Sequence, residues 1–339
     1  MILVVKGVAK VSKRGSTVVV STPKSVRNGE SSDRKIQPTW ESQTIPLLDL
    51  ELLVIVGSRV RVSSGVLLLL SEAGVPVVVH GRRSNSVLVN PFNVRVADVR
   101  RRLYNISENP VWVVSVGMKF IEGKLYGMIN LLRYLTYKEV ERGKDLKWIL
   151  DKLNEIEKLM RDEKDSIKSV DALRIYEAKW SKRLWELAST FIPSEYGFTG
   201  RDPKSRDPIN SAVSYCYAII YGLCTHALIA AGLDPYVGII HSERAGKTSL
   251  VYDFSEMFKP IAVHAVVVAS RATTLGVDGS SYLTKSSLEV VTRHLYRLLK
   301  RKHHKWRYTA RGEIYAKAWE LRQNIEKGTK FEPFIYVIK

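Results

Sequence analysis

The chain has 339 residues, 45% hydrophobic and 26% charged, which is typical of a soluble globular protein with one large or two ordinary domains. An excess of 53 Lys and Arg over 34 Asp and Glu favours a polyanionic partner such as nucleic acid, although a generic basic surface would give the same count. The longest apolar runs, at 66–70 and 265–269, are far too short to span a membrane, so we expect no membrane association.

The first ninety residues predict a small β-domain with one helix. A stretch at 66–73 predicts the helix, and β-branched runs predict strands at 2–8, 16–21, 52–56, 59–62, 75–80 and 86–89. The sequence Asn90-Pro91-Phe92 interrupts the chain, and with the arginine-rich stretch at 95–102 it indicates a domain boundary or a linker. We therefore predict one domain at residues 1–92, which also supplies the dimerisation contact, and a second at 93–339.

The second domain is predicted to be entirely helical. A hydrophobic period near 3.6 residues predicts helices at 116–137, 146–161, 167–190, 209–231, 249–259, 263–272, 285–301 and 311–327. Cys216 and Cys224 lie in one of them, too far apart for a disulfide, which fits a reduced cytoplasm. The fold class is therefore α+β, with a small N-terminal β-domain followed by a larger all-α domain.

The helix at 167–190 has a carboxylate on its apolar side. Positions that step by four or three residues form one seam: Leu173, Glu177, Trp180, Leu184 and Leu187. An unpaired buried carboxylate is costly, so Glu177 needs a metal or another cation, or it must be protonated. A local ion pair with Arg174 or Lys179 is the alternative.

A second group of ligand-type residues follows the apolar run at 237–240. His241 ends that run, and a helix then extends to Pro260, which we expect to stop it. Asp253 and Glu256 are three residues apart and are expected to project from one side of this helix. One imidazole and two carboxylates are a plausible set of ligands for a divalent metal, although surface residues of an ordinary amphipathic helix would give the same pattern.

A phosphate loop is excluded in the same stretch. The sequence Ala245-Gly246-Lys247-Thr248 is similar to the end of that motif. The motif requires a glycine five positions before Gly246, and His241 stands there, so the backbone cradle for phosphates is incomplete.

The C-terminal part of the chain is strongly basic. Its densest run, at 300–307, reads Lys-Arg-Lys-His-His-Lys-Trp-Arg. Basic side chains around Trp306 suit contact with phosphates and stacking on bases. A solvated helix end is the alternative, and the His303-His304 pair has no nearby carboxylate and makes a poor metal site.

Several groups of residues together carry a longer signature. They are Ile45-Pro46-Leu47, Val54-Ile55-Val56-Gly57, Val62-Ser63-Ser64, Asp207-Pro208-Ile209-Asn210, Tyr215, Tyr217, Ala218, the run Gly232-Leu233-Asp234-Pro235-Tyr236-Val237-Gly238-Ile239-Ile240-His241, Gly246, Ser249-Leu250, Asp253, Glu256 and Phe258-Lys259-Pro260. In this order they resemble the CRISPR-associated integrases of spacer acquisition, the family of the Cas protein numbered one. The resemblance covers nearly the whole chain.

The resemblance implies a fold, a metal site and partners. It implies a small β-domain joined to a helical catalytic domain, in which Glu177, His241 and Glu256 hold the metal and Asp253 lies alongside as a further catalytic residue. It also implies a homodimer and a small ferredoxin-like Cas partner, which together insert spacers into CRISPR arrays in antiviral defence. Imidazole plus carboxylates suits Mn²⁺ better than Mg²⁺, which prefers oxygen ligands.

The function expected from this resemblance is that of a metal-dependent DNA integrase and endonuclease. It would act on double-stranded and branched DNA in the cytoplasm, by transesterification or hydrolysis of phosphodiester bonds. The alternative is a basic nucleic-acid-binding protein whose metal is structural or absent.

The sequence departs from the family pattern at a few positions. His264-Ala265 stands where the family usually has Asp-Arg, and Ser214 and Cys216 replace an Asn and a Gly that are common there. Support of the site by these positions is therefore not carried over.

Overall fold

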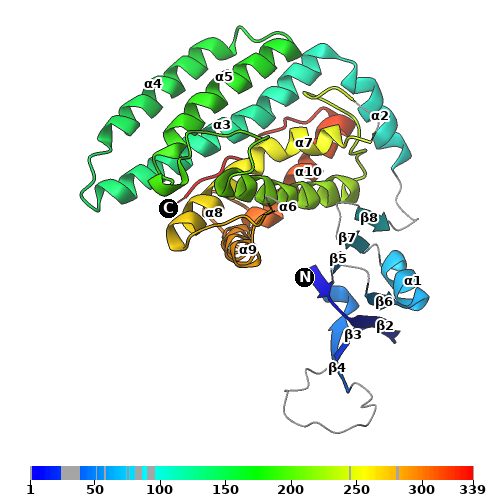
Figure 1. Cartoon of the computed structure of the whole chain (residues 1–339). Helices are drawn as coiled ribbons and strands as arrows, with labels where there is room; N and C mark the ends of the chain where they lie inside the picture. Colours follow the sequence, from blue (N-terminus) through cyan, green and yellow to red (C-terminus); the bar gives the residue numbers. More distant parts are fainter. Residues whose placement is uncertain are drawn as a thin grey trace, which may run out of the picture. The chain divides into compact units, whose positions relative to one another are not determined.

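The computed structural model describes residues 2–23, 39–50, 52–56, 59–73, 75, 77–80, 86–89, 96–243, 246–279 and 282–338. The chain forms two compact units, Met1–Arg95 and Val96–Lys339, coloured along the chain in Figure 1. The predicted domain boundary, between residues 92 and 93, lies outside the described residues.

The first unit contains two four-stranded sheets within the described residues. One has the order β1 (Ile2–Lys6), β5 (Leu52–Val56), β7 (Val77–His80) and β8 (Ser86–Val89), with only β8 antiparallel to its neighbour. The other has the order β4 (Trp40–Pro46), β3 (Thr17–Pro23), β2 (Ala9–Arg14) and β6 (Val60–Val62). Helix α1 (Ser64–Glu72) follows β6, and its Val66 and Leu70 are fully buried in the same apolar core as Val18 and Leu53 of the two sheets.

The predicted β-domain is confirmed, but the sequence did not predict strands β2 and β4. Strand β2 buries Ala9 and Val11 and exposes basic residues between and after them. This pattern has a period of two, but it contains no run of β-branched residues, which was the signal used to predict strands. Strand β4 is an edge strand with mostly exposed polar side chains, so only its hydrogen bonds to β3 identify it.

The second unit is helical, as predicted. Its helices are α2 (Ala97–Ser107), α3 (Pro110–Val140), α4 (Lys147–Lys164), α5 (Val170–Ser189), α6 (Pro208–Ala230), α7 (Ser249–Ser255), α8 (Lys259–Ala272), α9 (Lys285–Leu299) and α10 (Ala310–Lys327), with short 3₁₀ turns η2 (Ser194–Tyr196) and η3 (Glu256–Phe258). The long α3 packs against α4, α5, α8 and η3, and Figure 1 shows α3, α4 and α5 side by side. It therefore forms the centre of this unit.

Helix α6 is the core helix that the sequence predicted. It is long and apolar enough to cross a membrane by length and composition alone, but 56% of its most apolar window is buried inside the protein, as in a core helix. Cys216 and Cys224 are buried on it and free, in agreement with the predicted absence of a disulfide.

The arginine-rich stretch at 95–102 begins at the boundary between the two units. From Ala97 onward it is not a linker but the start of α2, which buries Val99 and Leu103 while its arginines lie on other sides. One local prediction, about Pro260, was wrong. Pro260 does not stop the helix before it. Helix α7 ends at Ser255, and Pro260 lies in the first turn of α8, where a proline costs no hydrogen bond because the first helical N–H groups have no partner anyway.

The C-terminal segment after α10 is extended and packs onto η3 and α3. Phe334 stacks on Phe258 with ring centroids 4.9 Å apart, and its backbone N–H donates to the sulfur of Met257. Trp306 stacks on Tyr336 and is only 7% exposed. The base-stacking role predicted for Trp306 is therefore wrong, because the C-terminal segment covers its ring.

We expect Gly123→Ala to destabilise the protein. A Cβ at Gly123 of α3 would lie 2.6 Å from the backbone oxygen of Phe334 and 2.7 Å from Cγ of Met257, so the C-terminal segment or η3 must shift. Overpacking of this kind costs about 1–3 kcal/mol. Gly222→Ala is the matched control: that glycine is exposed on α6 with nothing within 4 Å, so alanine should stabilise by about 0.5–1 kcal/mol. Urea unfolding measures both, and equal effects would contradict the packing.

We expect His264 to make the protein less stable in mild acid. Burial lowers the pKa of His264 to about 4, and its Nδ1 lies 2.8 Å from the Tyr336 hydroxyl. The unfolded chain takes up this proton near pH 6.5, so stability is full above that pH and falls as the pH drops toward 4. The loss from about pH 7.5 to about pH 5 is about 2 kcal/mol.

The measurement is urea unfolding of His264→Gln across that pH range. Glutamine does not titrate, so the variant should lose about this much of the pH dependence. His304→Gln changes an exposed histidine and should keep it. If the free energy of unfolding of H264Q changed with pH as much as that of the wild type, His264 would not be the group responsible.

Candidate metal centre

The carboxylate of Asp253 holds His241 in a tight loop. Asp253, fully buried on α7, accepts hydrogen bonds from the backbone N–H groups of Ile239 (2.7 Å), Ile240 (2.8 Å) and His241 (3.1 Å). Nδ1 of the His241 ring also donates to Oδ1 of Asp253. One carboxylate therefore satisfies three backbone donors and orients the imidazole, which leaves Nε2 as the nitrogen that faces other groups.

The loop before α7 folds closely on itself. A Cβ at Gly238 would lie 2.0 Å from the backbone oxygen of His241, so only glycine fits there. Arg174 of α5 donates from Nε to the carbonyl of Ile240 at 2.8 Å, and Gly238 N–H donates to Glu243 at 3.2 Å. These contacts fix where the loop ends and where His241 lies.

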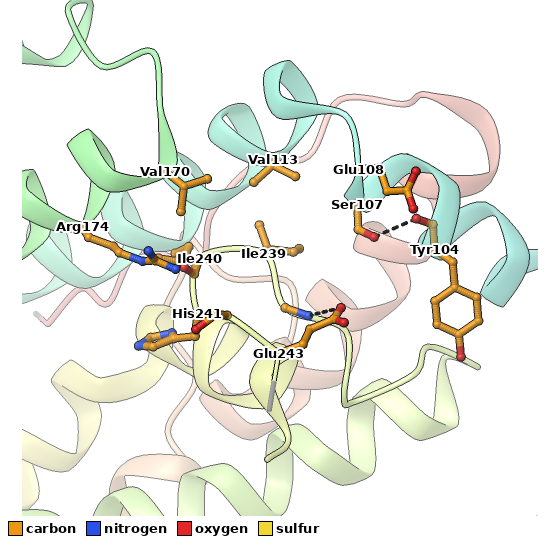
Figure 2. Close-up of a pocket in the computed structure, with 12 residues that line it drawn as sticks. Tyr104, Ser107, Glu108, Val113, Val170, Arg174, Ile239, Ile240, His241 and Glu243 are labelled. Carbon is orange, nitrogen blue, oxygen red and sulfur yellow. Dashed lines mark hydrogen bonds between the residues drawn. The ribbon is translucent and has the colours of Figure 1, made fainter. Parts of the chain in front are cut away.

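A hollow of about 580 Å³ lies beside this loop. Figure 2 shows Tyr104 and Ser107 of α2, Val113 of α3 and Arg174 of α5 around it, with the His241 ring pointing away from Glu243. His241 is one of the residues that line this hollow, together with Ile239 and Ile240 of the same loop.

Two carboxylates from distant parts of the chain meet at one lysine. Nζ of Lys124, in the middle of α3, donates to Oε1 of Glu177 on α5 and lies 2.9 Å from Oε2 of Glu256 on η3. Lys259, at the start of α8, donates to Oε1 of Glu256 at 2.5 Å, and the Ser181 hydroxyl donates to Glu177 at 2.7 Å. Lys124, Glu177, Glu256 and Lys259 form what we call the charge cluster.

Lys124 and Glu256 are the buried members of the charge cluster, and each keeps the other charged. Burial raises the pKa of Glu256, but the charges of Lys124 and Lys259 outweigh it and lower that pKa to about 2. Burial likewise lowers the pKa of Lys124, while the charges of Glu256 and Glu177 raise it by more, so the pKa ends above its ordinary value. In formal charge, the two lysines of the cluster balance its two glutamates.

The predicted site residues form two groups. Glu177 and Glu256 share Lys124, whereas His241 pairs with Asp253. Within the described ranges, no three His, Cys, Asp or Glu side chains lie close enough together to hold a metal ion. Asp253 and Glu256 lie three residues apart across the junction of α7 and η3, and they bind different partners: His241 and two lysines, respectively.

The seam position of Glu177 is confirmed and its partner is now known. Leu173, Trp180 and Leu184 are buried on the same seam. Neither Arg174 nor Lys179 pairs with Glu177: Arg174 pairs with Asp171, and Lys179 with Glu163. The cation that this carboxylate requires comes from another helix.

The donor chemistry of the charge cluster fits a divalent cation. Two carboxylates converge on a single cationic atom, and Oε2 of Glu256 is held only by its ion pair with Lys124, at 2.9 Å. His241 presents Nε2 while a carboxylate binds Nδ1, the arrangement in which histidines usually bind metals. Glu177, Glu256 and His241 are thus suitable ligands in kind, with Lys124 at the point between the two carboxylates.

The signature residues at the start of α6 have a structural role. Asp207 caps the helix by accepting from the N–H groups of Ile209 and Asn210, both at 2.9 Å. Arg201 donates to the side chains of Asn210 (2.8 Å) and Ser214 (2.9 Å). Asn210 and Ser214 therefore anchor the preceding loop, and neither lies in the charge cluster.

Sequence analysis did not identify Lys124. One signal was present: Lys124 follows Ile121 by three residues and precedes Met128 by four, and both of these are buried. A lysine on an apolar helix face needs a carboxylate partner, just as Glu177 needs a cation. Matching the two required knowledge of how α3 and α5 pack.

Known proteins resemble this chain over most of its length. A match to the family described as "CRISPR associated protein Cas1" spans residues 2–294. The CRISPR-associated endonuclease Cas1 of Hyperthermus butylicus is 30% identical over 301 residues, which are 85% of this chain and 88% of that protein.

Solved structures share the fold over nearly the whole chain. A casposase bound to integration product has a TM-score of 0.73 at 20% identity, with 98% of this chain and 92% of that chain covered. A Cas1 protein from Thermotoga maritima has a TM-score of 0.72 at 13% identity, with 98% of this chain and 99% of that chain covered. A chain of a partial Cas6-RT-Cas1–Cas2 complex has a TM-score of 0.69 at 15% identity, with 100% of this chain and 99% of that chain covered. The family match over residues 2–294 and the 30% identity to the Hyperthermus butylicus protein show that the chain belongs to the Cas1 family of CRISPR-associated proteins.

Proposed function

We propose that this protein is a metal-dependent DNA integrase and endonuclease that inserts spacers into CRISPR arrays. The observation that carries the proposal is the convergence of Glu177 and Glu256, from two separate elements, on one buried cationic position. Relatives named as endonucleases and a structural neighbour bound to integration product support it.

The residues divide the work between holding a metal and holding DNA. We propose that Glu177, Glu256 and His241 bind Mn²⁺ or Mg²⁺, with Asp253 orienting His241. When bound, the metal would polarise the phosphoryl oxygens and stabilise the leaving oxygen. Lys259 keeps Glu256 ionised and in place, and basic side chains neutralise the DNA backbone. The nucleophile is the 3′-hydroxyl of incoming DNA in integration and water in hydrolysis.

The proposed partners are DNA, a second copy of the chain and a small Cas protein. The +19 net charge favours double-stranded and branched DNA. The name of one structural neighbour places a related chain in an assembly with Cas2, and we propose an equivalent ferredoxin-like partner here. Homodimerisation through the β-domain and location in the cytoplasm remain proposals of the same kind.

One observation favours the alternative of a DNA-binding protein without a catalytic metal. The charge cluster is already neutral without any metal, because two lysines balance two glutamates. Turnover of branched DNA in Mn²⁺, against DNA binding alone, separates the two functions.

We expect Glu177→Gln, His241→Ala and Glu256→Gln each to lose metal-dependent activity, by at least about a hundredfold, because each removes a proposed ligand. Cleavage and strand transfer on branched DNA in Mn²⁺ measure the activity, and a gel-shift titration should show wild-type DNA binding. Glu186→Gln, on the exposed side of α5, is the matched control and should remain active. Substantial activity in E177Q or H241A would overturn the assigned site.

Asp253→Asn should lower activity by less, roughly 10–100-fold, because Asp253 orients His241 instead of binding the metal in this proposal. A thermal melt checks that the loop at 238–241 is intact in this variant. Wild-type activity in D253N would contradict the positioning role.

The basic run at 300–307 is expected to bind the DNA backbone. Lys300, Lys302 and Lys305 are exposed and Arg301 is half-buried, so their charges are accessible although Trp306 is not. Neutralising these four should weaken DNA binding and flatten its salt dependence by up to about 0.9 log unit per lost contact.

A control variant removes the same charge elsewhere. It neutralises four exposed lysines of α4 and α5: Lys147, Lys152, Lys158 and Lys182. If both variants change the salt slope equally, net charge and not the 300–307 run determines binding. An unchanged slope in the first variant would show that the run is solvated surface.

A further inference from the structure

Lys124 occupies the position between the two carboxylates that the proposed metal needs. Its side chain is 11% exposed, and it reaches Glu177 and Glu256 from the middle of α3. Lys259 binds the other oxygen of Glu256, so each carboxylate of the pair has an ammonium partner. The protein thus satisfies this pair by itself.

A divalent cation added to this cluster would meet two like charges. With both lysines in place, the local charge would rise from zero to +2 in a buried site, where charges repel far more strongly than in water. Two changes relieve the repulsion: the Lys124 ammonium moves out from between the carboxylates, or an anion arrives. A DNA phosphate is the anion that this basic protein is built to attract.

Resting on the function proposed above, we propose that Lys124 is an internal counter-cation that a divalent metal must displace, and that its displaced ammonium binds the phosphate of the DNA strand. Metal binding and DNA binding then strengthen each other. Lys124 in this role is a positioning residue: it keeps the carboxylates paired before the metal arrives and holds the strand afterwards. Free Mn²⁺ would bind weakly until DNA is present.

Mn²⁺ binding, followed by the electron paramagnetic resonance signal of free Mn²⁺, tests this without any turnover. Wild-type protein should bind Mn²⁺ at least about tenfold more tightly when a short DNA duplex is added. Lys124→Met should bind Mn²⁺ at least about tenfold more tightly than wild type without DNA, and DNA should tighten its binding little. Lys124→Arg, which keeps the charge, should behave as wild type.

A second lysine–glutamate pair, which joins α4 to α3, provides the control. Lys164 binds the buried Glu122 on α3, outside the charge cluster. Lys164→Met therefore removes a similar ion pair and should leave Mn²⁺ affinity unchanged. If Lys124→Met is too unstable without metal, Lys124→Gln supplies an amide donor to the carboxylates and is measured in its place.

The outcomes separate this proposal from the proposed function. One outcome is that Glu256→Gln abolishes Mn²⁺ binding, whereas Lys124→Met and Lys124→Gln do not tighten it. This result would overturn the role of Lys124 and leave the metal site intact. Mn²⁺ binding that Glu256→Gln leaves unchanged, or none in any variant, would overturn the metal site and this role together. Tightening in Lys124→Met, with loss of the DNA effect, would support both.

Discussion

The charge cluster is the interaction on which the helical unit depends. It joins α3, α5 and the η3–α8 junction through Lys124, Glu177, Glu256 and Lys259, all of them largely shielded from water. Removing a charge from water costs several kcal/mol, and removing one partner of a buried pair leaves the other uncompensated. The helices must therefore pack so that these four charged side chains contact one another. This requirement restricts how far each helix can shift along its axis.

The surroundings of the cluster hold it rigidly on two sides. On one side, Asp253 ties the 239–241 backbone and the imidazole to α7, and Arg174 ties the same loop to α5. On the other, the C-terminal segment places Phe334 against Phe258 and Met257, next to Gly123 of α3. Groups that must act within a fraction of an ångström need support of this kind. The last residues of the chain thus contribute to a site more than seventy residues away.

The same physical requirement underlies both the lysine-paired cluster and the proposed metal site. Two buried carboxylates need a positive charge, and either a lysine or a divalent ion can supply it. In this chain Lys124 supplies it. The cluster is therefore neutral in formal charge, although its carboxylates are also suitable in kind as ligands for Mn²⁺. The basic surface adds a second, separate use of charge: Trp306 of the run at 300–307 is taken into the core, while the lysines around it stay accessible.

The sequence by itself determined the fold class, the family signature and the anomaly at Glu177, because hydrophobic period and residue order are local properties of the chain. It also gave the helix of Asp207 and the free cysteines. Only the tertiary structure decided which groups meet: Lys124 with Glu177, 53 residues apart, and His241 with Asp253 while Glu256 turns to two lysines. It also placed Pro260 inside α8 and identified β4, whose polar side chains give no signal. A periodic pattern tells which face of an element is buried, but the partner on the other side depends on how distant elements pack, and no local pattern encodes that.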